Sequence, residues 1–180
     1  MDNPGLYIKN QKQRGEWAEM RFLARVSELG LTVIRPWGDS LHYDMVVESD
    51  GCLLRVQVKS STCKRNNSYF VNLHGSSHYY TKADFDFIAA YIIALDLWYI
   101  IPAEAALRGR DKLCMTPGSP KARYEPYREA WHLLKEKPCA TNANAVDLCF
   151  RHGCRERMAQ DTTPSSPTPT ELSSRPASRP

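Results

Sequence analysis

The chain has 180 residues, of which 42% are hydrophobic, and this is enough for one domain with a modest core. Its 24 Lys and Arg against 20 Asp and Glu give a formal net charge of +4. This charge is compatible with a polyanionic partner but does not demand one. No secretory apolar segment opens the chain, and no apolar run reaches about 20 residues. We therefore expect a cytoplasmic protein with no membrane partner and with reduced cysteines.

The first part of the chain predicts a polar arm followed by a helix. Residues 1–13 are largely polar, and residues 14–30 show helical periodicity. At about 100° per residue, Glu19 lies in the same apolar stripe as Phe22 and Val26. A carboxylate at a position where a core residue is expected is typical of a functional site.

A hairpin is predicted around Asp50 and Gly51. Both residues tolerate the positive φ that a two-residue hairpin turn needs, so this pair is a strong turn signal. Counting outward from the turn along both strands brings Asp44 opposite Gln57. These two side chains are then expected on one face.

Alternation along the second strand of the hairpin separates a polar face from a core face. Gln57 and Lys59 project together, whereas Leu54, Val56 and Val58 project to the other side and form core. A carboxylate, an amide and an ammonium group on one side of an apolar hairpin are costly to bury unless they serve each other or a bound ion.

The remaining pattern predicts an α/β fold with a central mixed sheet of about five strands flanked by helices. Further strands are expected at residues 31–35, 68–74, 87–95, 98–101 and 113–116, and further helices at residues 102–107 and 127–137. Residues 138–180 are expected to be a disordered tail, because their low-complexity, Pro-, Ser- and Thr-rich composition cannot bury enough apolar surface.

Several short stretches, in this order and at these spacings, resemble the PD-(D/E)xK nuclease superfamily. They are Gly15-Glu16-Trp17-Ala18-Glu19, Tyr43-Asp44-Met45-Val46-Val47, Arg55-Val56-Gln57-Val58-Lys59, Asp86-Phe87-Ile88-Ala89-Ala90-Tyr91 and Trp98-Tyr99-Ile100-Ile101-Pro102. The chain is most similar to the group with Gln in place of the second acid, which includes a group I intron homing endonuclease and bacterial relatives. The resemblance covers about residues 14–108 and implies a restriction-endonuclease-like core over residues 14–137.

The resemblance implies a metal site. Asp44 would anchor Mg²⁺, or Mn²⁺ in its place, together with an oxygen of Gln57 or the carbonyl of Val58 and with Glu19. Lys59 would orient the attacking water and stabilise the transition state. Because Gln57 removes a negative charge, affinity for the ion should fall. Whether the site stays active is left open.

The resemblance also implies DNA as partner and a homodimer or tetramer as assembly. Contacts to the DNA backbone are expected from Arg14, Lys64, Arg65 and Lys82, with His74 or His78 as further candidates. The leading interpretation is a metal-dependent DNA endonuclease of homing, restriction or mobile-element type. The alternatives are a nuclease that resolves Holliday junctions or repairs DNA, and a DNA-binding relative that has lost its metal.

Simpler interpretations exist for single residues. Asp44 alone could cap a turn, and Lys59 alone could be a solvated lysine at a strand end. Tyr79 and Tyr80 could stack on unpaired bases or pack against the core. A zinc site is a weak alternative near the end of the chain, where the candidate ligands are Cys139, Cys149, His152 and Cys154.

Overall fold

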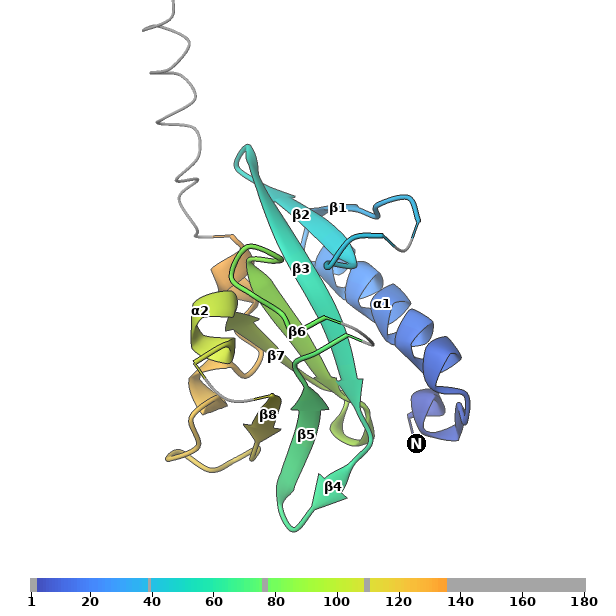
Figure 1. Ribbon diagram of the computed structural model, residues 1–180, viewed down its shortest axis with the longest axis vertical. Helices are drawn as coiled ribbons and strands as arrows, with labels where there is room; N and C mark the ends of the chain where they lie inside the picture. The colour runs from blue at the N-terminus through green and yellow to red at the C-terminus, as the bar shows by residue number, and fades with distance from the viewer. Residues whose placement is uncertain (1–2, 39, 76–77, 109–110, 136–180) are drawn as a thin grey trace, which may run out of the picture. The chain divides into compact units, whose positions relative to one another are not determined.

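The computed structural model describes residues 3–38, 40–75, 78–108 and 111–135, so the predicted tail at 138–180 lies outside the described residues. A five-stranded sheet forms the centre, with β3 parallel to β6 and all other neighbours antiparallel. Its strands, in spatial order, are β1 (Thr32–Ile34), β2 (Met45–Ser49), β3 (Cys52–Ser61), β6 (Phe87–Ile92) and β7 (Leu97–Pro102) (Figure 1). The predicted α/β fold with a mixed sheet of about five strands is confirmed.

A second, three-stranded sheet holds β4 (Lys64–Arg65), β5 (Ser68–Asn72) and β8 (Lys112–Met115). The strands predicted at 68–74 and 113–116 do form, and Val71 pairs with Leu113. They pair with each other and not with the central sheet. Both residues are buried, so this small sheet closes a second core against β6 and β7.

Helix α1 (Gln11–Glu28) packs along the central sheet beside β2 and β3 (Figure 1). It begins three residues before the predicted start because the side chain of Asn10 accepts hydrogen bonds from the amides of Lys12, at 2.9 Å, and Gln13, at 3.2 Å. Within the described residues, no helix is long and apolar enough to cross a bilayer.

Strand β6 is buried along its whole length. Phe87, Ala89 and Tyr91 belong to the core beneath α1, whereas the alternate residues face the core under α2 (Ala103–Ala106) and the small sheet. A strand buried on both faces reads as a continuous apolar run, as the sequence predicts here. A short 3₁₀ turn, η2 (Ile93–Leu95), then leads into β7.

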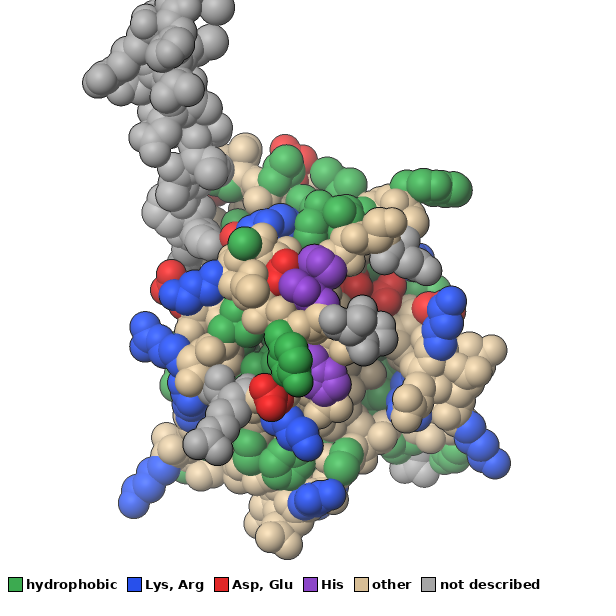
Figure 2. Space-filling model, in the orientation of Figure 1, with side chains coloured by type: hydrophobic (Ala, Val, Ile, Leu, Met, Phe, Trp, Pro, Cys, Tyr) green, Lys and Arg blue, Asp and Glu red, His purple; other side chains and the backbone are tan. Residues whose placement is uncertain are grey.

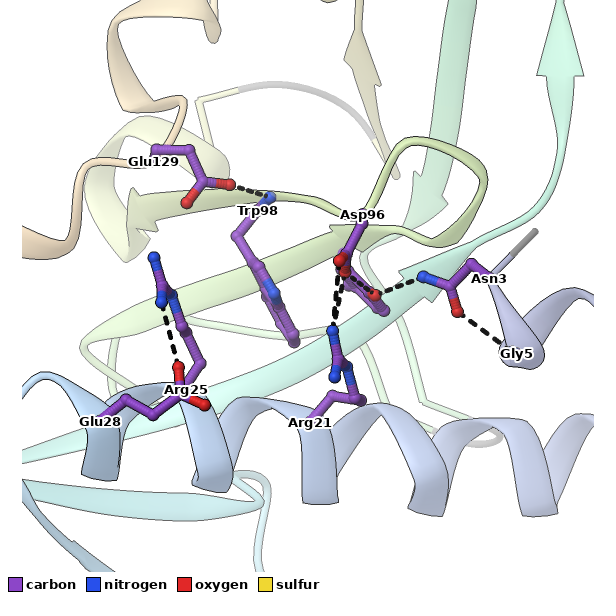
Figure 3. Close-up of polar contacts among 9 residues, drawn as sticks. Asn3, Gly5, Arg21, Arg25, Glu28, Asp96, Trp98 and Glu129 are labelled. Atoms are coloured by element: carbon purple, nitrogen blue, oxygen red, sulfur yellow. Dashed lines mark hydrogen bonds and ion pairs between the residues drawn. The ribbon is translucent and has the colours of Figure 1, made fainter. Parts of the chain in front are cut away.

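The expected polar arm is instead bound to the domain. Residues Pro4–Tyr7 form a 3₁₀ helix, η1, and the side-chain amide of Asn3 donates to the hydroxyl of Tyr91 at 2.8 Å. That hydroxyl donates to Asp96, and Asp96 pairs with Arg21 of α1 at 3.0 Å (Figure 3). This chain of contacts joins Asn3 to α1 and to the β6–β7 connection, so the described part of the predicted arm packs against the domain.

The helix predicted at 127–137 does not form over the described part of that range, residues 127–135. Two 3₁₀ turns, η3 (Glu125–Tyr127) and η4 (Trp131–Leu134), stand in its place, separated by Glu129 at φ 49°. The amide of Glu129 donates to the carbonyl of Trp98 at 2.9 Å, and its carboxylate accepts from the Trp98 amide at 2.7 Å (Figure 3). These bonds to the edge strand β7 replace the bonds that a helix would have made.

We expect Glu129→Ala to lower the free energy of unfolding by about 1–3 kcal/mol, because the substitution leaves the Trp98 amide and the Trp131 indole N–H without their acceptor. Urea unfolding followed by tryptophan fluorescence measures the change. The exposed Glu104 supplies the control, and Glu104→Ala should stay within about 0.5 kcal/mol of the wild type. Equal stability of the two variants would contradict this role of Glu129.

Candidate active site

The hairpin of β2 and β3 has the predicted register. Asp50 and Gly51 take φ values of 50° and 75°, and Ser49 pairs with Cys52. Met45 pairs with Val56, so the same register places Asp44, one residue before β2, opposite Gln57. The turn therefore fixes which residues of the two strands meet.

Asp44 is held by the second strand of the hairpin. One oxygen of its carboxylate, Oδ2, accepts from the amide of Val58 at 2.7 Å and from Nε2 of Gln57 at 2.5 Å. Gln57 is buried, and its Nε2 also lies 3.3 Å from the carbonyl oxygen of Val58. The carboxylate, the amide group and the backbone of Val58 thus form one hydrogen-bonded group.

Lys59 lies two residues further along β3, on the same face as Gln57. Its Nζ is 5.2 Å from the centre of the Tyr80 ring, a cation–π distance. Tyr80 in turn packs edge-on against Phe85, with ring centres 5.2 Å apart. This contact agrees with the packing interpretation of Tyr80 and places the ring beneath the ammonium group.

Glu19 reaches the hairpin from α1. Its carboxylate lies 3.2 Å from the guanidinium of Arg35, and its side chain is 20% exposed against 57% for Arg35. The buried residues Ala18 and Phe22 on either side of it hold this stretch of α1 against the sheet. Glu19, the acid predicted within the apolar stripe, therefore faces inward at the edge of that stripe.

All the predicted catalytic and metal-binding residues line one cavity of about 410 Å³. They are Glu19, Asp44, Gln57, Val58 and Lys59. We call this cavity the cleft. Acidic and histidine side chains gather near the middle of the face that Figure 2 shows.

Burial raises the pKa of the Asp44 carboxyl above its ordinary value. The amide of Val58, the positive charges of Lys59 and Arg35, and the hydrogen bond from Gln57 all act in the opposite direction, but they do not outweigh burial. Asp44 is therefore a carboxylate for which a further positive charge would be favourable.

The predicted DNA-binding residues lie in three places. Arg14 and His74 line the cleft, and Arg14 also donates to the carbonyl of Ile8 at 3.1 Å. The exposed Lys64 and Arg65 form β4 in the small sheet, outside the cleft lining. Lys82 lines another cavity, of about 450 Å³, with residues such as Phe85, Pro102 and Glu104.

Two residues beside the site carry no signal in the sequence. Arg35 ends the stretch predicted as the strand at 31–35, and nothing local indicates that it pairs with Glu19. The sequence indicates Tyr80 only as a base-stacking or core residue, and its place under Lys59 depends on the fold. Both contacts join segments that are distant in sequence.

Comparisons with known proteins find one family model and similar solved structures. The family model of the PD-(D/E)XK endonucleases matches residues 9–134. Among solved structures, the bacterial homing endonuclease I-Ssp6803I is 32% identical with a TM-score of 0.62, and the match covers 69% of this chain and 93% of that one. The Holliday junction resolvase Hjc of Archaeoglobus fulgidus is 14% identical with a TM-score of 0.48, covering 67% and 99%. The comparison with curated proteins finds no match.

The family match includes α1, the hairpin and the rest of the cleft. It confirms the resemblance that the sequence motifs indicate. The chain belongs to the PD-(D/E)XK endonuclease family.

Proposed function

We propose that the protein hydrolyses phosphodiester bonds of DNA at the cleft, with Glu19, Asp44, Gln57 and Lys59 as catalytic residues and with Mg²⁺, or Mn²⁺ in its place, as the ion. The observation that supports this most is the convergence of these side chains from α1, from the residue before β2 and from β3 on one cavity. Turn caps and solvated strand-end lysines, taken singly, would not meet in this way.

The donor set of the cleft fits a hard divalent ion. Two carboxylates, a side-chain amide and the Val58 carbonyl offer oxygen atoms, which Mg²⁺ prefers. Burial already raises the pKa of Asp44, so a cation beside it would relieve an unfavourable charge. When bound, the ion would neutralise charge developing on the phosphate and make a water molecule more acidic.

Gln57 must change its orientation to serve as a ligand. Its amide nitrogen, not its oxygen, faces Asp44 at 2.5 Å. Turning the amide over would present the oxygen, at the expense of this hydrogen bond. We infer that the neutral amide weakens ion binding both by its missing charge and by this rearrangement.

Lys59 and Glu19 act from the two sides of the cleft. Lys59 supplies a positive charge that can orient the attacking water and stabilise charge in the transition state. Glu19 accepts a proton or holds a water molecule once Arg35 releases it. The ion pair between Glu19 and Arg35 lies at the surface, where such a pair contributes only about 0–1 kcal/mol to the free energy of unfolding. Exchange of Arg35 for another cation is therefore easy.

The likeness to a bacterial homing endonuclease leads us to propose a homing-type nuclease. We also propose that it works in the cytoplasm as a homodimer or tetramer. A second candidate rests on the hydrogen bond between Gln57 and Asp44. If the amide never turns, the cleft stays closed to an ion and the protein binds DNA without cutting it.

We expect the wild type to cleave supercoiled plasmid in Mg²⁺ and not in EDTA, and Asp44→Ala and Lys59→Ala each to lower the rate by about 10²-fold or more, because each removes a charge from the cleft. Gel electrophoresis of the plasmid measures the rate. A linear duplex and a four-way junction in the same assay separate a homing-type activity from a junction-resolving one.

The exposed Lys121 provides a matched control, and Lys121→Ala should cleave at the wild-type rate. Cleavage that survives both cleft substitutions would contradict the proposed site. DNA binding without cleavage by the wild type would favour the second candidate.

We expect Asp44→Asn to raise the free energy of unfolding at pH 8 in EDTA. The raised pKa means that folding favours the protonated acid, so the wild type is at its full stability below the ordinary pKa of Asp and loses stability as the pH rises through the folded pKa. The difference between the two proteins should shrink towards pH 4. Urea unfolding from pH 4 to 8 measures it.

Mg²⁺ should shift this comparison in favour of the wild type. At ten times its dissociation constant it stabilises the wild type by about 1.4 kcal/mol, and it should not stabilise Asp44→Asn. A stability difference that does not vary with pH, or an equal effect of Mg²⁺ on both proteins, would argue against an ion at Asp44.

Arg14→Ala should weaken duplex binding more than Lys64→Ala or Lys82→Ala, because among these residues only Arg14 lines the cleft. Its loss should also make the slope of log affinity against log salt shallower by about one. Fluorescence anisotropy of a labelled duplex at several salt concentrations measures both. Equal effects of the three substitutions would place the DNA path away from the cleft.

A further inference from the structure

A second group of metal-ligating side chains lies near the cleft. His42 belongs to the loop between β1 and β2, two residues before Asp44, whereas His78 and Asp84 belong to the segment between β5 and β6. One ligand atom from each lies within 4.8 Å of the other two. Within the described part of the chain, these three form the one such group of His, Cys, Asp or Glu.

Two of the three side chains are already fixed. The Nε2 atom of His78 lies 3.0 Å from Oδ2 of Asp84, and the same oxygen accepts from the amide of Thr81 at 2.6 Å. Burial opposes ionisation of Asp84, but the hydrogen bonds from Thr81 and His78 outweigh it and lower its pKa. The carboxylate is therefore ionised and held beside an imidazole.

The third side chain, His42, stacks on His78 with ring centres 4.1 Å apart and planes inclined by 9°. Parallel rings do not direct their lone pairs at one point, so this arrangement alone does not enclose an ion. His42 is exposed, and turning its ring about the side-chain bonds would direct one nitrogen towards Asp84. The distances between the three ligand atoms must also shorten from up to 4.8 Å, because Zn²⁺ bonds of about 2.0–2.2 Å keep ligand atoms within about 4 Å of one another.

We propose that His42, His78 and Asp84 bind Zn²⁺, with a solvent molecule as fourth ligand. Two imidazoles and one carboxylate suit Zn²⁺, whereas Mg²⁺ prefers oxygen alone. The site is chemically distinct from the oxygen-rich cleft. It joins the loop that leads into Asp44 to the segment that carries Tyr80.

This connection gives the ion a role. The His78 ring lies 6.2 Å from the Tyr80 ring, and Tyr80 lies under the ammonium group of Lys59. An ion that fixes His78 therefore also limits the movement of Tyr80. The Zn²⁺ site joins the loop before Asp44 to the segment that carries Tyr80, and so limits the movement of the ring under Lys59.

The test is a titration of Zn²⁺ into the untagged, metal-free full chain carrying Asp44→Asn, so that the cleft lacks its principal ligand. We expect one tight Zn²⁺ per chain. His42→Ala and His78→Ala should each weaken binding at least about 10-fold, since even indirect partners of metal ligands are worth that much. Asp84→Asn keeps an acceptor for Thr81 and should also weaken binding. The exposed His132 on η4 is the matched control, and His132→Ala should bind like its parent.

Co²⁺ gives a second measurement that does not depend on activity. It should produce weak visible absorption bands that disappear in His42→Ala and His78→Ala, without the intense near-ultraviolet band of a thiolate ligand. The proposal is overturned if both histidine substitutions leave Zn²⁺ affinity unchanged. It is also overturned if Cys149→Ser removes the tight site, because the ion would then belong to the cysteines near the end of the chain. Far-UV circular dichroism checks that each variant is folded.

Discussion

The burial of the Asp44 carboxylate against β3 is the interaction on which the site depends. Removing a carboxylate from water is costly unless donors replace the lost hydration, and here the Val58 amide and the Gln57 side chain replace part of it. Both donors come from the strand opposite. A register slip of one residue would turn Gln57 and Lys59 to the other face and leave the carboxylate without its side-chain donor. The Asp50-Gly51 turn, which sets the register, is therefore as important to the site as the charged residues themselves.

The central sheet gives this group a rigid base, while the loops around it can adapt. Strand β3 lies between β2 and the parallel strand β6, and β6 is buried on both faces. Side chains on such strands keep their positions. Glu19 and Arg35 instead meet across an exposed ion pair between a helix and a loop, which is weak enough to exchange partners. The fixed part of the site is thus the hairpin, and the adjustable part is the acid from α1.

The features that sequence reasoning predicts correctly are those fixed by local rules. The positive φ values at Asp50 and Gly51 determine the hairpin, period-two alternation determines its core face, and the stripe on α1 places Glu19 near the sheet. The features it missed depend on contacts between distant segments. The described part of the helix predicted at 127–137 does not form, because Glu129 instead makes hydrogen bonds to Trp98, about 30 residues earlier in the sequence. The separate pairing of β5 with β8 and the contact of Arg35 with Glu19 depend on the complete fold in the same way.

Gln57 gives the Asp44 carboxylate a hydrogen-bond donor from the hairpin itself. A second carboxylate at this position would lie beside Asp44 as a like charge, and it would disfavour ionisation of both groups until a cation arrived. The amide instead donates to Asp44, so the hairpin offsets part of the cost of burying this acid. A neutral amide at position 57 therefore lowers the electrostatic cost of the buried carboxylate, which a second acid would raise.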